Sequence, residues 1–234
     1  MGPVVLKRVH DVGDAEWTQA TLAEIEQDGF RVASPIAAAT GRWVLDQWSA
    51  NEFIADLRPA APRWDVVIES GLRFGEAAER ARPAGSDALD ARTHRWAVAD
   101  RVAWSEAEVL LSPEAARVLD QLAQLVAPDD EPERHFVHGD LSGNVFLDAA
   151  RRPVILDVSP YLRPRRWAAA IVVADAVLWH GADASLARRF ASQDSDRDLL
   201  GRALSFRLVA EQLAIGPRHG AMLEPYRRML PAIR

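Results

Sequence analysis

Polar side chains that could perform chemistry gather between residues 138 and 157. His138, Asp140 and Asn144 lie on a polar segment between two apolar runs, and Asp157 follows a third apolar run. Carboxylate and amide oxygens are the ligands that Mg²⁺ prefers, and a carboxylate can accept a proton from a hydroxyl group. These residue types predict a site that holds Mg²⁺ with two side chains and accepts a proton with a third.

The elements that position these side chains form a predicted hairpin over residues 136–159. The runs 145–147 and 154–156 are β-prone, and the segment 149–152 between them is typical of a turn. The polar side chains therefore project from strand ends and loops. A polar hairpin loop without chemistry is the alternative, but two aspartates with an asparagine are unusual in a purely structural hairpin.

The segment 138–144 followed by residues 155–157 resembles the catalytic loop and metal-binding aspartate of the aminoglycoside phosphotransferase family. These are small-molecule kinases with a protein-kinase-like fold. The resemblance implies that Asp140 accepts the proton of the substrate hydroxyl and that Asn144 and Asp157 hold the Mg²⁺ ions that bridge the nucleotide phosphates.

Two further roles in this loop follow from the same resemblance. His138 would orient the loop. The interval from Asp140 to Asn144 is one residue shorter than is usual in the family, so Ser142 is a second candidate for the role of Asn144.

The start of the chain supplies a candidate phosphate ligand. Residues 4–7 are β-like and end in Lys7. The resemblance implies that this lysine contacts the α- and β-phosphates and is held by a glutamate of the following helix. The helix predicted over 11–27 offers Glu16 and Glu24. Glu16 is preferred, and the alternative is that both glutamates are solvent-facing charges.

A turn is predicted at 40–41 and a strand from Trp43 to Trp48. The resemblance places the hinge between two lobes near residues 47–50. Trp48 and Ser49 would then lie beside the adenine of ATP, which the backbone would recognise. The expected fold is α+β and protein-kinase-like.

The predicted division into lobes has its boundary after residue 48. A truncated N-terminal β lobe covers residues 1–48. A mainly helical C-terminal lobe, which carries the catalytic hairpin at 136–159, covers residues 49–234.

Helical signals dominate after residue 50. Apolar residues between 67 and 78 mark one buried face, Ser112 and Pro113 begin a helix, and a helix through 199–213 ends at Gly216. Asp175 resembles a further aspartate of the family, which we interpret as structural support.

Three arginines beside two aromatic residues follow the hairpin. One interpretation is a loop that binds an anionic or sugar-like substrate, and the other is a solvated loop paired with acids. The arginines are Arg163, Arg165 and Arg166.

Composition excludes several classes of protein. The 234 residues include 28 basic and 34 acidic side chains, a net charge of −6, which argues against a nucleic-acid-binding surface. The absence of cysteine excludes disulfides and thiolate chemistry. No apolar run approaches the length of a membrane span, so a cytoplasmic protein without membrane association is predicted.

Family members begin with two strands joined by a Gly-rich loop that covers the nucleotide phosphates. Only six residues precede Lys7 here, so we expect either that the gene start has been placed too far downstream or that the protein has lost this cover. In the chain as given, one sheet edge would be unpaired. The leading hypothesis is an ATP- and Mg²⁺-dependent phosphotransferase acting on a hydroxyl of a small molecule.

Two alternatives remain open. One is a degenerate kinase-like protein that binds a nucleotide or a partner without turnover. The other is a metal-dependent hydrolase built on His138, Asp140 and Asp157. Neither the identity of the substrate nor the oligomeric state can be read from the sequence.

Overall fold

The computed structural model describes residues 2–83, 85–127, 133–216 and 223–233. The chain divides into two compact units. Unit 1 comprises residues 1–92 and 133–168, and unit 2 comprises residues 93–132 and 169–234.

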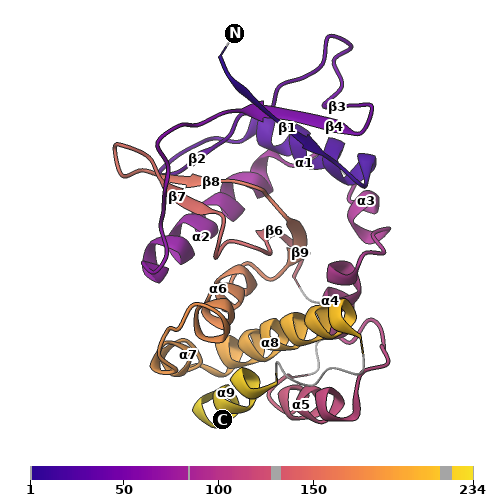
Figure 1. Ribbon diagram of the computed structural model, residues 1–234, viewed down its shortest axis with the longest axis vertical. Coiled ribbons are helices and arrows are strands. Elements are labelled where there is room, and N and C mark those ends of the chain that lie inside the picture. The colour runs from indigo at the N-terminus through magenta and orange to yellow at the C-terminus, as the bar shows by residue number, and fades with distance from the viewer. Residues whose placement is uncertain (1, 84, 128–132, 217–222, 234) are drawn as a thin grey trace. The chain divides into compact units, whose positions relative to one another are not determined.

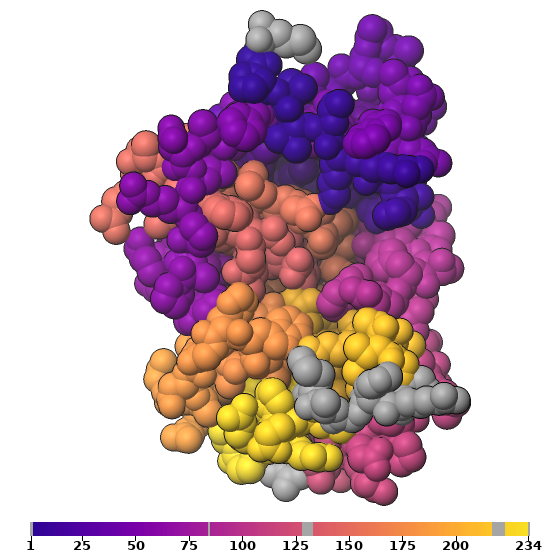
Figure 2. All heavy atoms as spheres, viewed as in Figure 1, coloured from indigo at the N-terminus to yellow at the C-terminus, as the bar shows by residue number. Residues whose placement is uncertain are grey.

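The first sheet of unit 1 has three antiparallel strands in the order β1-β4-β3 (Figure 1). They are β1 (Val4–Arg8), β3 (Val44–Leu45) and β4 (Trp48–Glu52). The strand predicted to end in Lys7 is therefore confirmed as β1. Its side chains are exposed along its whole length, and Figure 2 shows this indigo segment at the surface. Among the described residues β1 pairs only with β4, so it forms an edge of the sheet.

The strand predicted from Trp43 to Trp48 is interrupted by a tight turn. Asp46 and Gln47 have φ values of 49° and 65°, and the chain reverses there between β3 and β4. Two consecutive residues with positive φ suit a two-residue hairpin loop. The usual Asn-Gly or Asp-Gly signal is missing from this turn, so the sequence pattern concealed it.

This turn corrects the predicted hinge at 47–50. Residues 48–52 form the central strand of the sheet, and the compact unit continues to residue 92. The lobe boundary expected after residue 48 therefore differs from the division of the structure.

Two helices of unit 1 pack against each other, and the second of them also contacts the strands that carry the predicted site. Helix α1 (Val12–Glu24) begins after Asp11, whose carboxylate accepts a hydrogen bond from the Asp14 N–H at 3.0 Å. Helix α2 (Trp64–Ala81) buries the face predicted from the apolar spacing. A row of aromatic rings links the two helices, with centroid separations of 5.6 to 6.1 Å. The rings in contact order are those of Trp17 in α1, Phe136, Phe74 in α2 and His138.

The predicted hairpin is confirmed as β7 (Val145–Leu147) and β8 (Pro153–Ile155), with Val145 opposite Ile155. It belongs to a sheet in the order β2-β8-β7-β5, with β2 (Arg31–Val32) and β5 (Arg58–Pro59). A separate two-stranded sheet pairs β6 (His135–His138) with β9 (Pro160–Arg163), and a short helix α3 spans Asp87–Asp90 (Figure 1).

Two of the three arginines after the hairpin have defined surroundings in and beside β9. Arg163 is buried in this strand, and Arg165 Nη1 lies 3.1 Å from a carboxylate oxygen of Glu76. Arg165 therefore pairs with an acid, as the second interpretation expected, whereas Arg163 lies in a buried strand and not in a solvated loop.

Unit 2 is mainly helical. Its helices are α4 (Arg95–Ala103), α5 (Pro113–Ala123), most of α6 (Trp167–Leu178), α7 (Ser185–Phe190), α8 (Asp194–Ile215) and α9 (Glu224–Ile233). Ser112 caps α5 by accepting a hydrogen bond from the Ala115 N–H at 3.2 Å, and α8 ends before Gly216, which has a φ of 77°. Among the described residues, no helix is both long enough and apolar enough to cross a lipid bilayer.

Candidate functional site

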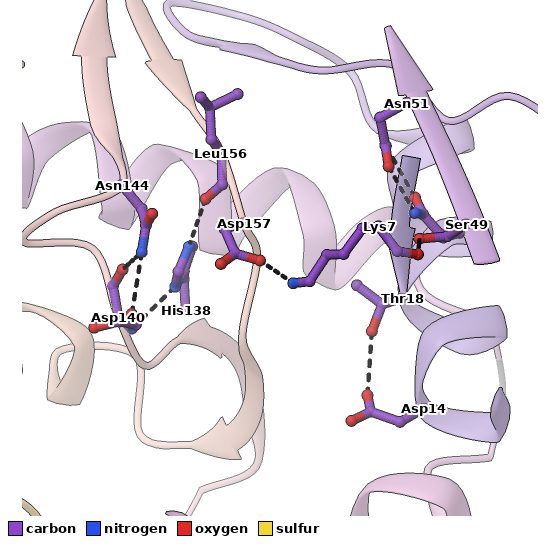
Figure 3. A network of polar contacts seen from close by, with 11 residues as sticks. Lys7, Asp14, Thr18, Ser49, Asn51, His138, Asp140, Asn144, Leu156 and Asp157 are labelled. Atoms are coloured by element: carbon purple, nitrogen blue, oxygen red, sulfur yellow. Dashed lines mark hydrogen bonds and ion pairs between the residues drawn. The ribbon is translucent and has the colours of Figure 1, made fainter. Parts of the chain in front are cut away.

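His138 connects the two loops that carry the predicted site residues. It is fully buried at the end of β6. Its Nδ1 accepts a hydrogen bond from the Asp140 N–H at 3.0 Å, and its Nε2 lies 3.3 Å from the carbonyl oxygen of Leu156. The tautomer with its proton on Nε2 satisfies both bonds. The imidazole therefore holds the segment at Asp140 beside the one that leads to Asp157 (Figure 3).

Asp140 and Asn144 are linked within their loop. The Asn144 side-chain nitrogen donates to the Asp140 carbonyl oxygen at 2.7 Å and to the Asp140 carboxylate at 3.1 Å. Because the amide nitrogen makes both bonds, the amide oxygen of Asn144 is the atom that could ligate a metal. The Asn144 N–H also donates to the Leu141 carbonyl oxygen at 3.0 Å, which closes the loop into a compact turn.

Asp157 follows β8 in an uncommon backbone conformation. Its φ is 47°, in the left-handed region that residues other than glycine seldom adopt. Its carboxylate forms an ion pair with the Lys7 ammonium group (Figure 3). Both side chains are more than half exposed, so solvent screens their attraction.

The neighbours of Lys7 differ from the prediction in one respect. Glu16 does not pair with this lysine. Its carboxylate accepts hydrogen bonds from Arg42 Nε at 3.2 Å and from the backbone N–H groups of Trp43 and Val44 at 3.2 and 3.1 Å. Glu16 thereby joins α1 to β3. Three donors converge on it because the segment 42–44, which leads into β3, lies beside the helix.

The residues predicted beside adenine lie on β4. Ser49 is buried and pairs with Lys7 in the β1–β4 ladder, and its hydroxyl lies 3.5 Å from the Lys7 carbonyl oxygen. Trp48 is exposed opposite Arg8. Neither residue is in a hinge, and Glu24 lies exposed at the end of α1.

The side chains of the predicted site suit a Mg²⁺ ion bound beside a nucleotide. In the described part of the chain, no group of three or more His, Cys, Asp or Glu side chains could hold a metal ion. Mg²⁺ beside a nucleotide commonly uses one or two protein oxygens and completes its octahedron with phosphate oxygens and water. Asp157 and the amide oxygen of Asn144 fit that requirement. A hydrolytic metal centre, which needs a denser set of protein ligands, does not fit them.

Two glycine contacts near the site were missed by the sequence analysis. A Cβ atom at Gly139 would overlap the ring of Tyr161, and one at Gly71 would overlap the side chain of Leu141. The only available signal was the glycine between His138 and Asp140. Its packing partner Tyr161 lies on another strand, and local patterns do not reveal such a partner.

The same arrangement of elements occurs in a solved structure. The crystal structure of spectinomycin phosphotransferase in complex with ADP and spectinomycin superposes with a TM-score of 0.53 and 15% sequence identity. The match covers 97% of this chain and 80% of that chain. This chain has the aminoglycoside phosphotransferase fold. The α+β, protein-kinase-like fold expected from the sequence is thereby confirmed. No protein-family model matches the sequence, and a search of curated proteins finds no similar one.

Proposed function

We propose that this protein is an ATP- and Mg²⁺-dependent phosphotransferase that phosphorylates a hydroxyl group of a small molecule. One observation carries the proposal. Lys7, Asp157, Asn144 and Asp140 lie in a single network, connected by the ion pair, by His138 and by the bonds of the Asp140 loop.

Each residue has a distinct role in the proposed reaction. Asp140 accepts the proton of the acceptor hydroxyl while the hydroxyl oxygen attacks the γ-phosphorus. The bond from that phosphorus to the bridging oxygen of ADP breaks, and the products are ADP and a phosphate monoester. Lys7 pairs with the nucleotide phosphates, and Asn144 and Asp157 hold Mg²⁺. The bound metal supplies neutralisation of the phosphate charge.

The ion pair of Lys7 with Asp157 is compatible with these roles. Both groups are exposed, so the pair contributes little to stability and is easily exchanged for stronger partners. A nucleotide with Mg²⁺ offers a partner to each group, because its phosphates attract the lysine and its metal attracts the carboxylate. The ADP in the similar structure supports a nucleotide ligand here, and its second ligand supports a small-molecule acceptor.

The first test measures nucleotide binding by calorimetry on the full chain. ATP and ADP should bind more tightly when Mg²⁺ is present, and Asp157→Ala should remove that gain. Asp120→Asn, at an exposed position of α5, serves as the control for loss of an aspartate charge. Equal affinity with and without Mg²⁺ in the parent protein would contradict the metal site.

The second test measures phosphate transfer to a panel of hydroxylated small molecules. With an active acceptor, Asp140→Asn should reduce turnover by roughly 10²–10⁴-fold and leave the unfolding transition unchanged. Turnover within threefold of the parent would exclude Asp140 as the base.

A second candidate function is nucleotide binding without turnover. The observation that favours it is that Glu16 binds the segment at Trp43 and Val44, and among the described residues Lys7 pairs with Asp157 and not with a glutamate. In protein kinases the corresponding lysine–glutamate pair must be in place for activity. Mg²⁺-dependent nucleotide binding without transfer to any acceptor would favour this candidate.

A further inference from the structure

Arg92 is a buried charged residue that joins three elements of unit 1. It is 7% exposed. Its Nε donates to the Leu89 carbonyl oxygen at 3.0 Å, and its Nη2 donates to the Pro160 carbonyl oxygen at 2.8 Å. Its Nη1 lies 3.6 Å from a carboxylate oxygen of Asp14 in α1. Burial of a charge is costly without such partners, so this set of contacts fixes the guanidinium in place.

The guanidinium in turn lies over the ring of Tyr161 in β9. The Arg92 Cζ atom is 4.8 Å from the ring centroid, a cation–π geometry. The Tyr161 ring also makes an edge-to-face contact with the ring of Trp167, with centroids 5.7 Å apart and ring planes at 81°. Two aromatic and cationic neighbours therefore restrict the position of the Tyr161 ring.

The Tyr161 ring supports the backbone immediately before Asp140. A Cβ atom at Gly139 would lie 2.5 Å from Tyr161 Cδ2, so the glycine backbone approaches the ring as closely as its missing side chain allows. The Gly139 N–H also donates to the Ser159 carbonyl oxygen at 2.9 Å, next to Pro160, the residue that Arg92 binds. A shift of Arg92 or Tyr161 would therefore move Gly139 and, with it, Asp140.

We propose that Arg92 and Tyr161 are positioning residues that set the place of Asp140 and connect it to the start of α1 through Asp14. The consequence for catalysis rests on the proposed function, because it takes Asp140 as the base. The physical coupling of Arg92 to the Asp140 loop is independent of the proposed function. Glu16 is engaged by the β3 hairpin, so Asp14 is the acidic residue through which α1 reaches this network.

The decisive experiment compares Arg92→Lys with the parent full-length chain. Lysine keeps the charge but lacks the planar fork that makes two backbone hydrogen bonds and stacks on a ring. The readout is hydrogen exchange of the Asp140 amide, which donates to His138 Nδ1. We expect this exchange to accelerate about tenfold relative to the amide of Val172 in α6, the scale of coupling between neighbouring networks. With an active acceptor, kcat should fall about ten- to a hundredfold while KM for ATP stays within twofold.

Arg202→Lys is the matched control. Arg202 is also buried, donates to backbone carbonyl oxygens and stacks on Trp104, but it lies in unit 2. It should leave both the relative exchange of the Asp140 amide and kcat at the parental values. Asp14→Asn is a milder variant that neutralises the acidic partner of Arg92 in α1, and it should change both readouts in the same direction as Arg92→Lys.

The outcomes separate this inference from the proposed function. Parental exchange of the Asp140 amide in Arg92→Lys overturns the inference, and if that variant does not fold, parental exchange in Asp14→Asn overturns it. Faster exchange in a protein that transfers phosphate to no acceptor supports the positioning network and counts against the proposed function alone.

Discussion

At the scale of single residues, Lys7 and Asp157 form an exposed ion pair between two of the predicted site residues. The residue proposed to bind phosphate is paired with the residue proposed to bind metal. The lysine ammonium group and a metal cation would therefore compete for the same Asp157 carboxylate. Since exposed ion pairs contribute roughly 0–1 kcal/mol, this competition should be modest and measurable.

The prediction at this scale concerns metal binding without a nucleotide. Lys7→Met should raise the affinity for Mn²⁺, used as a spectroscopic substitute for Mg²⁺, by about two- to fivefold, the equivalent of a surface ion pair. The same variant should weaken binding of ATP with Mg²⁺, because a phosphate partner is lost. Titration followed by electron paramagnetic resonance measures the first effect.

Arg8→Met is the control, since it removes a neighbouring positive charge of β1 that contacts Gln47 instead of Asp157. An unchanged Mn²⁺ affinity in Lys7→Met would show that the lysine does not compete for the carboxylate.

At the scale of elements, α2 packs closely against the Asp140 loop at a glycine. Gly71 lies against Leu141, which is fully buried directly after Asp140. A methyl group at this position has no room, and a packed interior resists added volume. The close approach of helix and loop therefore depends on this glycine.

Gly71→Ala should lower the free energy of unfolding by about 1–3 kcal/mol, the usual cost of overpacking. Urea denaturation followed by circular dichroism measures the change. Gly13→Ala is the control, because a Cβ there meets only ordinary contacts at 3.5 Å. The double variant with Leu141→Val should recover part of the loss, and a single variant as stable as the parent would disprove the packing argument.

The helices α6 and α8 are joined by a buried ion pair. Arg207 Nε and Nη2 each donate to a carboxylate oxygen of Asp175 at 2.7 Å, and both side chains are at most 2% exposed. The structural support inferred for Asp175 from the sequence thus has a concrete partner.

Asp175→Asn should cost about 3–5 kcal/mol of stability, because it leaves a buried arginine charge uncompensated. Asp194→Asn, which removes an exposed partner of Arg197 from the same helix α8, should cost less than about 1 kcal/mol. Thermal and urea unfolding would measure both variants, and equal losses would contradict the distinction between buried and exposed pairs.

At the scale of the whole molecule, one half-buried carboxyl makes stability depend on pH. Glu211 of α8 accepts hydrogen bonds from Trp179 Nε1 at 3.0 Å and from the Tyr226 hydroxyl at 2.9 Å, so it connects α8 to α9 and to the turn directly after α6. Burial raises the pKa of Glu211 above its ordinary value of 4.5, and the hydrogen bonds only partly offset this effect. The folded chain therefore binds this proton more tightly than the unfolded chain.

The sign of the effect follows from linkage. The contribution of Glu211 is complete below its ordinary pKa and is lost as the pH rises through the raised pKa of the folded state. Glutamine does not titrate, so the Glu211→Gln variant does not lose stability in this way. Its stability relative to the parent should therefore improve as the pH rises from 4.5 to 8. Denaturation midpoints across this range measure the difference.

Asp183→Asn should show the opposite trend. Hydrogen bonds from the Ser185 side chain and N–H lower the pKa of Asp183, so its contribution is present at neutral pH and lost on acidification. A difference between Glu211→Gln and the parent that is independent of pH would disprove the role assigned to Glu211.

The sequence by itself determined the features that depend on neighbours along the chain. The β-prone runs and the turn between them predicted the hairpin that became β7 and β8, and Ser112 with Pro113 predicted the start of α5. The order His138, Asp140, Asn144 and Asp157 also indicated the fold that the similar structure shows. The hairpin and the start of α5 could be predicted because hydrogen-bonding and conformational preferences within a few residues decide them. The fold was indicated by the resemblance to a known family and not by such local preferences.

Only the tertiary structure decided which distant side chains meet. Glu16 was a reasonable partner for Lys7 by its position in α1, yet the β3–β4 hairpin brings three donors to it and Asp157 takes the lysine. The contact of Gly139 with Tyr161 likewise joins the loop after β6 to β9. Such choices depend on the competition between partners that packing brings together, and a carboxylate binds the donors that lie nearest in space rather than those nearest in sequence.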